Sequence, residues 1–240
     1  MKRIAIVGAM HQELEALLAA MPDERPVQRA GREFWLGHLA GHEVVVVLSR
    51  IGKVAAATTA TLLLSDFEVS RIVFTGTAGG LAPGVNVGDV VVADTLLQHD
   101  MDASPLFPRH EVPLYGRDRF AADAAMSAAL AEASREALAA LGADAAKVHR
   151  GLVVSGDRFV CERAENDALC ARLPDALAVE MEGAALAQVC HDFGVPFAVV
   201  RTVSDRADDS AHVDFNRFVA EVASRYTLAI VSRWLTNSSS

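Results

Sequence analysis

The sequence contains only three cysteines, Cys161, Cys170 and Cys190, and no Cys-x-x-Cys pair. An odd count without metal-ligand spacing argues against a disulfide framework and against a structural zinc site. The eight histidines are scattered and form no His-Glu-x-x-His motif. We therefore expect neither a metal nor a cofactor.

Clusters of basic residues are also missing, since 22 lysines and arginines stand against 31 acidic residues, for a formal net charge of −9. Nucleic-acid binding relies on grouped basic side chains, so we expect no such partner. No apolar run approaches the about 20 residues of a membrane span. The apolar stretch Ile4–Val7 near the first residue is too short for a signal peptide. These absences predict an acidic cytoplasmic protein without a membrane partner.

The 240 residues, 52% of them hydrophobic, alternate between short β-type runs and amphipathic helical patterns. Strands are expected over residues 2–7, 34–39, 44–48, 71–75, 89–97, 149–154, 176–180 and 197–202, with the second and third forming a hairpin. Helices are expected over residues 11–21, 52–65, 121–141, 163–173, 182–193 and 214–235, the second of them buried. No linker or repeat divides the chain. The pattern predicts one α/β domain over residues 1–235, with a central mixed sheet flanked by helices, and a disordered tail over residues 236–240.

Ligands of such folds bind at the carboxyl ends of strands. Polar or glycine-rich residues occupy five predicted strand ends: Gly8-Ala9-Met10, Gly76–Gly80, Ser155-Gly156-Asp157, Glu180-Met181-Glu182 and Ser204-Asp205. Each also has an ordinary explanation, because glycines form tight turns, and acidic or hydroxyl residues cap helices. The functional alternatives are a loop that approaches a sugar or an anion, a carboxylate acceptor for ribose hydroxyls, and a general acid oriented by a neighbouring hydroxyl.

Seven runs occur in a recognisable order between residue 2 and about residue 235: Ile6–Met10 with Glu13, Ile51–Ala56, Thr75–Gly80, Val87–Val91, Ser155–Phe159, Val179–Glu182 and Val200–Asp205. Together they resemble the 5′-methylthioadenosine/S-adenosylhomocysteine nucleosidase family of the purine nucleoside phosphorylase-like superfamily. The segment Ala103–Gly116 matches least. The resemblance implies a nucleoside phosphorylase-like fold.

The resemblance also implies an activity, the hydrolysis of the N-glycosidic bond of 5′-methylthioadenosine and S-adenosylhomocysteine to adenine and a 5-thio-substituted ribose. It assigns the general acid to Asp205 and the activation of water to Glu13. Adenine is a poor leaving group, so the acid must protonate it, which calls for a pKa raised by burial. The implied substrate-binding residues are Gly79, Val160, Met181, Glu182, Phe159, Ser204, Thr77, Met10, Ile51 and Phe215. Among them, Phe159 would stack on adenine and Glu182 would bind the ribose hydroxyls.

Three alternative functions stay open on this scaffold: a purine nucleoside phosphorylase, a hydrolase of futalosine-type nucleosides, and a non-catalytic nucleoside-binding protein. Glu13 would repel phosphate, and binding alone would need neither Glu13 nor Asp205, so hydrolysis is favoured. The resemblance further implies a homodimer whose partner chain closes the 5′ pocket. Arg109, in the divergent segment, is expected in solvent, with recognition of a homocysteine carboxylate as its alternative role. Arg201 matches a family arginine near the site, and its role stays open.

Overall fold

A ten-stranded mixed sheet carries the fold. We describe it from a computed structural model that covers residues 3–208, 211, 215, 218 and 222–238, without the side chain of Glu13. The elements are β1 (Ile4–Gly8), α1 (His11–Ala19), β2 (Arg25–Arg29), β3 (Arg32–Leu39), β4 (His42–Leu48), α2 (Lys53–Asp66), β5 (Arg71–Gly80), β6 (Val90–Gln98), β7 (Arg119–Ala121), α3 (Ala124–Ala140), β8 (Val148–Ser155), α4 (Arg163–Arg172), β9 (Ala176–Glu180), α5 (Gly183–Phe193), β10 (Phe197–Asp205) and α7 (Ser224–Asn237).

One end of the sheet closes into a ring. β5, β9, β8, β6 and β10 pair in that order, and β10 pairs again with β5. Within this ring β10 is parallel to β5 and antiparallel to β6, while β9 is antiparallel to β5. From β5 the sheet continues through β1, β4 and β3 to β2 at its edge. The predicted α/β class with a central mixed sheet is confirmed.

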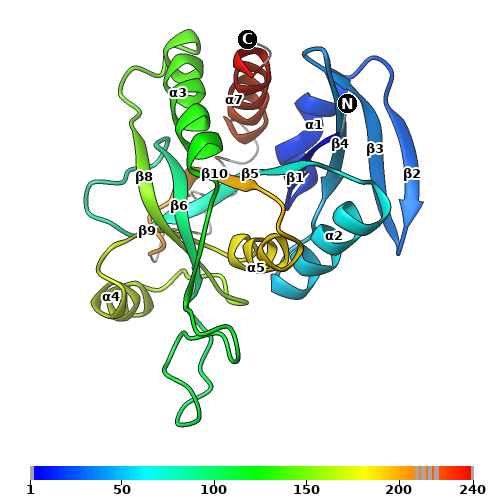
Figure 1. Cartoon of the computed structure of the whole chain (residues 1–240). Coiled ribbons are helices and arrows are strands. Elements are labelled where there is room, and N and C mark those ends of the chain that lie inside the picture. The colour runs from blue at the N-terminus through cyan, green and yellow to red at the C-terminus, as the bar shows by residue number, and fades with distance from the viewer. Residues whose placement is uncertain (1–2, 209–210, 212–214, 216–217, 219–221, 239–240) are drawn as a thin grey trace.

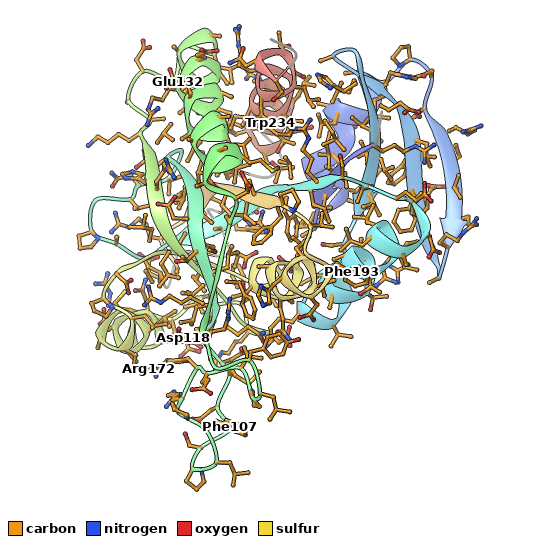
Figure 2. All side chains as sticks on the ribbon, in the orientation of Figure 1. Phe107, Asp118, Glu132, Arg172, Phe193 and Trp234 are labelled. Carbon is orange, nitrogen blue, oxygen red and sulfur yellow. The ribbon has the colours of Figure 1, made fainter. Side chains whose placement is uncertain are left out.

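Helices cover both faces of this sheet (Figure 1). α1, α3 and α7 pack together on one face, and α2 packs with α5 on the other. β1 and the middle of β4 are buried and apolar without alternation, as expected for strands that are covered on both sides. Trp234 of α7 is fully buried in the same cluster as Leu14 and Leu17 of α1 (Figure 2). The two helical layers therefore hold the strand ends in fixed positions.

The predicted hairpin is confirmed as the antiparallel pair β3–β4, but other bounds differ from those expected. Gly76–Gly80 is neither a turn nor a loop, because β5 runs to Gly80 and pairs there with β9. Ser204-Asp205 ends β10 instead of capping a helix. The sequence does not predict β2 or β7, since β2 has no alternating apolar pattern and β7 has three residues.

Two helices also differ from the expectation. α2 is only half-buried, because Val54 on its outer face is 78% exposed. α7 extends through Asn237, two residues into the segment expected to be disordered. Most of the first half of the predicted last helix, and residues 239–240, lie outside the described residues.

A long segment between β6 and β7, residues 101–118, leaves the body of the protein on the side of α2 and α5 (Figure 1). We call it the projecting loop. Its outward side chains include Leu106 and Leu114, which are 84% and 91% exposed. Phe107 also lies far from the sheet, within the projecting part (Figure 2). The divergent stretch of the sequence is thus the part of the chain that extends furthest from the core.

Candidate active site

A cavity of about 430 Å³ lies at the carboxyl ends of β1, β5, β9 and β10, within the size range of small-molecule sites. It is lined by Ala9, Met10, Ile51, Thr77, Ala78, Gly79, Phe159, Val179, Glu180, Met181, Glu182, Ser204, Asp205 and Phe215. Strand ends that are far apart in the sequence are therefore brought to one place, as the fold class predicts.

Most of the residues expected to bind substrate line this cavity. They are Met10, Ile51, Thr77, Gly79, Phe159, Met181, Glu182, Ser204 and Phe215, together with Asp205. Val160 lines a small adjoining recess that also contains Phe159 and Asp205. Glu13 stands in the first turn of α1, just after Met10, and its side chain lies outside the part of the chain that the structure describes.

Asp205 lies at the inner end of the cavity with 1% of its surface exposed. Its Oδ1 accepts a hydrogen bond from the N–H of Ala207 at 2.8 Å, and its Oδ2 accepts one from the Ser204 hydroxyl at 2.8 Å. A Cβ on Gly79 would lie 2.9 Å from Asp205 Oδ1 and 2.9 Å from the Ala207 Cβ. Only glycine fits at position 79, and the carboxyl group is held in one orientation.

Two aromatic rings form an apolar wall near this carboxyl group. The rings of Phe159 and Phe215 meet edge to face, with centroids 5.7 Å apart and planes at 66°. Phe159 keeps 39% of its surface exposed, so one ring face is accessible. A flat aromatic base can stack on such a ring.

Glu182 supplies a second carboxylate to the cavity and is 5% exposed. Its Oε1 accepts a hydrogen bond from the N–H of Gly52 at 2.8 Å. Gly52 is the N-cap residue of α2 and has a φ of 97°, a backbone conformation that residues other than glycine rarely adopt. The N-terminus of α2, which favours negative charge, therefore holds this carboxylate in place.

Comparisons with known proteins agree with this geometry. The model of the Phosphorylase superfamily matches residues 3–236. The 5′-methylthioadenosine/S-adenosylhomocysteine nucleosidase of Shewanella denitrificans is 37% identical over 232 residues, which cover 96% of this chain and 97% of the relative. The chain belongs to the 5′-methylthioadenosine/S-adenosylhomocysteine nucleosidase family.

Solved structures extend the comparison to three dimensions. The nucleosidase of Neisseria meningitidis in complex with methylthio-immucillin-A is 36% identical and superposes with a TM-score of 0.89, covering 99% of this chain and 100% of that one. A futalosine hydrolase of Helicobacter pylori is 32% identical, with a TM-score of 0.87 and 97% coverage of both chains. The family's fold thus also occurs in a hydrolase named for a different nucleoside.

Arg201, the family arginine whose role the sequence leaves open, is fully buried and pairs with Glu180 at 2.7 Å. Its guanidinium also donates to the carbonyl of Phe74 at 3.1 Å and lies 4.1 Å from the centroid of that ring. It donates a further hydrogen bond to the carbonyl of Val200 at 3.2 Å. Arg201 therefore neutralises Glu180 and anchors it to β5.

Glu180 lines the cavity, although the sequence assigns substrate binding only to its neighbour Glu182. Its carboxylate accepts hydrogen bonds from the N–H groups of Glu182 and Gly183, at 3.2 and 2.8 Å, and from the hydroxyl of Ser155. The helix-capping interpretation of this acidic pair is thus correct for Glu180, which caps α5. Its hydrogen bonds fix the turn that carries Met181 and Glu182.

The other lining residues that the sequence does not single out are Ala9, Ala78 and Val179. Small apolar side chains carry no chemical signal, and only their neighbours in the sequence mark them. Arg109 lies outside the cavity lining, half-exposed in the projecting loop, where it pairs with Asp102 at 3.6 Å. This agrees with its expected place in solvent.

Two further properties bear on the chemistry available to the described residues. Among them, no group of three or more histidine, cysteine, aspartate or glutamate side chains is placed to hold a metal ion. Within the same part of the chain, no helix combines the length and the apolar character needed to cross a membrane.

Proposed function

We propose that this protein hydrolyses the N-glycosidic bond of 5′-methylthioadenosine and S-adenosylhomocysteine, releasing adenine and the 5-thio-substituted ribose. The observation that carries the proposal is the buried carboxyl group of Asp205, held by Ser204 and by the N–H of Ala207 at the inner end of the cavity. The activity is assigned to a single domain over residues 1–235.

In the proposed reaction, adenine stacks on Phe159 and the backbone of Val160 binds its edge. Asp205 donates a proton to N7 of the purine while the bond between C1′ and N9 breaks and its electron pair moves to the base. Positioned proton transfer of this kind contributes about 10²- to 10⁴-fold to a rate. Ser204 acts on this step by holding the carboxyl group toward the base.

The ribose is assigned to the opposite side of the cavity, where Glu182 accepts hydrogen bonds from its vicinal hydroxyls. The same negative charge stabilises the oxocarbenium-like transition state, an electrostatic effect that is strong in a water-poor site. Glu13 holds a water molecule and takes its proton as the oxygen bonds to C1′. Met10, Ile51 and Phe215 line the side that would receive the 5′ substituent.

A nucleoside larger at its 5′ end is the second candidate substrate, because a futalosine hydrolase superposes on this chain nearly as well as a nucleosidase does. Incubation of the pure protein with methylthioadenosine, S-adenosylhomocysteine and a futalosine-type nucleoside, each with and without phosphate, tests both candidates by mass spectrometry of the products. Free adenine and a free thioribose in either buffer would support the proposal. A ribose 1-phosphate would indicate a phosphorylase, cleavage of the futalosine-type nucleoside alone would indicate the second candidate, and binding without cleavage would indicate a non-catalytic protein.

We also propose that the protein is a homodimer whose partner chain closes the 5′ pocket. Exposed apolar side chains support this assembly, since Val54 and Ile51 near the start of α2 and Leu106 and Leu114 in the projecting loop are 58–91% exposed. Such groupings commonly mark protein contacts. Light scattering should give twice the chain mass, and Leu106→Asp with Leu114→Asp should shift it to the monomer. A wild-type monomer at assay concentration would contradict the proposal.

The protein is further assigned to the cytoplasm. Its cysteines Cys161, Cys170 and Cys190 are all free thiols, the state that cytoplasmic reductants maintain. Cell fractionation tests this assignment, and recovery outside the cytoplasmic fraction would contradict it.

A further inference from the structure

Three segments meet beside the α2 N-terminus, joined by charged groups that the proposed reaction does not use. Asp100 follows β6, Lys53 begins α2, and Asp157 follows β8. Asp100 Oδ1 accepts a hydrogen bond from Lys53 Nζ at 2.6 Å, and Asp100 Oδ2 accepts one from the N–H of Asp157 at 2.9 Å. Asp157 Oδ1 accepts a hydrogen bond from the N–H of Lys53 at 2.7 Å. The three residues thus form a closed cycle of hydrogen bonds, which we call the Asp100 clamp.

The clamp is supported from behind by β6 and α5. Lys53 Nζ also donates to Gln98 Oε1 at 3.1 Å, and Gln98 Nε2 donates to Gln188 Oε1 at 2.8 Å. The Lys53 side chain is 17% exposed and that of Asp100 34% exposed. A partly buried pair with additional hydrogen bonds is better ordered than a surface ion pair.

The ionic state of Asp100 is consistent with this role. Burial raises the pKa of its carboxyl group, but the hydrogen bonds from Lys53 and Asp157 and the charge of Lys53 outweigh burial and hold the pKa below its ordinary value. The carboxylate therefore carries its charge throughout the neutral range.

The clamp acts directly on the residue before Lys53. The N–H of Gly52 donates a hydrogen bond to Glu182 Oε1 at 2.8 Å. The next peptide bond, between Gly52 and Lys53, bears the N–H that donates to Asp157 Oδ1. A Cβ at Gly52 would lie only 3.1 Å from Asp157 Oδ1. The clamp therefore holds the Gly52–Lys53 peptide, which adjoins the peptide that bears the Gly52 N–H. It restrains the backbone on which the position of the Glu182 carboxylate depends.

We infer that Asp100, Lys53 and Asp157 are positioning residues that align Glu182 with the ribose hydroxyls of the nucleoside. The inference rests on the proposed function, because it takes Glu182 as the ribose contact. None of the three needs to touch the substrate. The alternative is that the clamp only ties the fold together, in which case its loss would affect every ligand of the cavity alike.

Binding of two non-hydrolysable ligands separates these alternatives. The first ligand is a C-nucleoside analogue of 5′-methylthioadenosine, whose carbon–carbon glycosidic bond cannot be hydrolysed, and the second is its 2′,3′-dideoxy form, which offers nothing to Glu182. In Asp100→Asn, calorimetry should show the first ligand binding about tenfold more weakly. The dideoxy ligand should bind within about twofold of wild type, and kcat/KM for methylthioadenosine should fall about tenfold or more.

Two further variants keep the test decisive. Lys53→Met removes the ammonium group from the other side of the clamp and should likewise weaken binding of the first ligand but not of the dideoxy ligand. This variant provides the test if Asp100→Asn does not fold. Asp102→Asn is the matched control, since Asp102 is an acid of the projecting loop that forms an ion pair with nearby Arg109. It should leave both ligands and the activity unchanged.

Equal weakening of both ligands in the folded clamp variants, or no weakening of either, would overturn the inference. Failure of the wild-type protein to bind the first ligand would instead contradict the proposed function.

Discussion

The inner end of the cavity and its mouth are built in different ways. At the inner end, Asp205 and Ser204 are buried at the end of β10, against Gly79 of the neighbouring β5, and are hydrogen-bonded to backbone or to each other. At the mouth, Ile51 is 58% exposed. The projecting loop contributes nothing to the cavity lining among the described residues, and its Leu106 is 84% exposed. The proposed general acid is thus held by strands, whereas the exposed groups are carried by loops.

This difference separates two kinds of constraint. A side chain packed between paired strands cannot move without disturbing the sheet, so a change at the inner end affects both activity and stability. A side chain on an exposed loop has few neighbours, so its change affects recognition with little cost to the fold. The comparison predicts that the effects of substitution decrease from the inner end to the mouth.

The largest effect is expected at Asp205. Asp205→Asn keeps the size of the side chain and removes the transferable proton, so kcat should fall about 10²- to 10⁴-fold. Thermal unfolding by circular dichroism should show that the fold persists. A folded variant that retains most of its activity would remove Asp205 from the reaction.

Gly79→Ala tests the packing around the same group. The new Cβ would lie 2.9 Å from Asp205 Oδ1 and must displace it. We expect kcat to fall about 10- to 100-fold and the free energy of unfolding to fall by about 1–3 kcal/mol, the usual cost of overpacking. Gly84→Ala is the control, because nothing lies within 4 Å of its Cβ position. Similar results for the two variants would contradict the close fit at Gly79.

A buried histidine just after β6, His99, gives stability a pH dependence. Burial lowers the pKa of His99 below the ordinary histidine value of 6.5, and the charges of Arg172, Lys53 and His110 lower it further, while Asp100 opposes them. The unfolded chain therefore binds a proton at His99 more readily than the folded chain does. The contribution of His99 is constant above about pH 6.5 and falls by up to about 1.4 kcal/mol per pH unit below it.

Urea unfolding at pH 7.5, 6.5 and 5.5 measures this slope. His99→Gln removes the titrating group, so its free energy of unfolding should fall less steeply between pH 6.5 and pH 5.5 than that of the wild type. Identical slopes would show that His99 does not titrate differently in the folded state.

The smallest effect is expected at Arg109. Because its guanidinium is half-exposed and pairs with Asp102, Arg109→Ala should change kcat/KM by less than about twofold for both methylthioadenosine and S-adenosylhomocysteine. A selective loss of about tenfold for S-adenosylhomocysteine would instead assign Arg109 to its carboxylate. An exposed loop would then carry a strong interaction, contrary to the expected decrease of effects toward the exposed loops.

Local signals in the sequence predict the architecture and the strand ends that form the cavity, whereas the individual substrate-binding residues follow from the family resemblance. Short β-type apolar runs locate the strands, and polar strand ends such as Ser204-Asp205 indicate where a ligand binds. The extension of β5 is not predictable in this way, since Gly79 and Gly80 have low strand propensity. They are strand because Gly79 pairs with both β10 and β9 and Gly80 pairs with β9. Tertiary pairing determines their conformation.

Two acidic residues illustrate a second limit. Glu180 and Glu182 have the same side chain and stand two positions apart. The turn after β9 directs Glu180 toward Arg201 and Glu182 toward Gly52. The Asp100 clamp likewise joins residues that are 47 and 57 positions apart. No short sequence window contains both partners of such a contact.

The ring of strands leaves β2 as the long free edge of the sheet. An exposed edge offers unpaired backbone groups to which a strand of another molecule can add. β2 bears Arg25 and Arg29 near its two ends and Pro26, which has no N–H to donate. Backbone-mediated aggregation is thereby disfavoured at this edge.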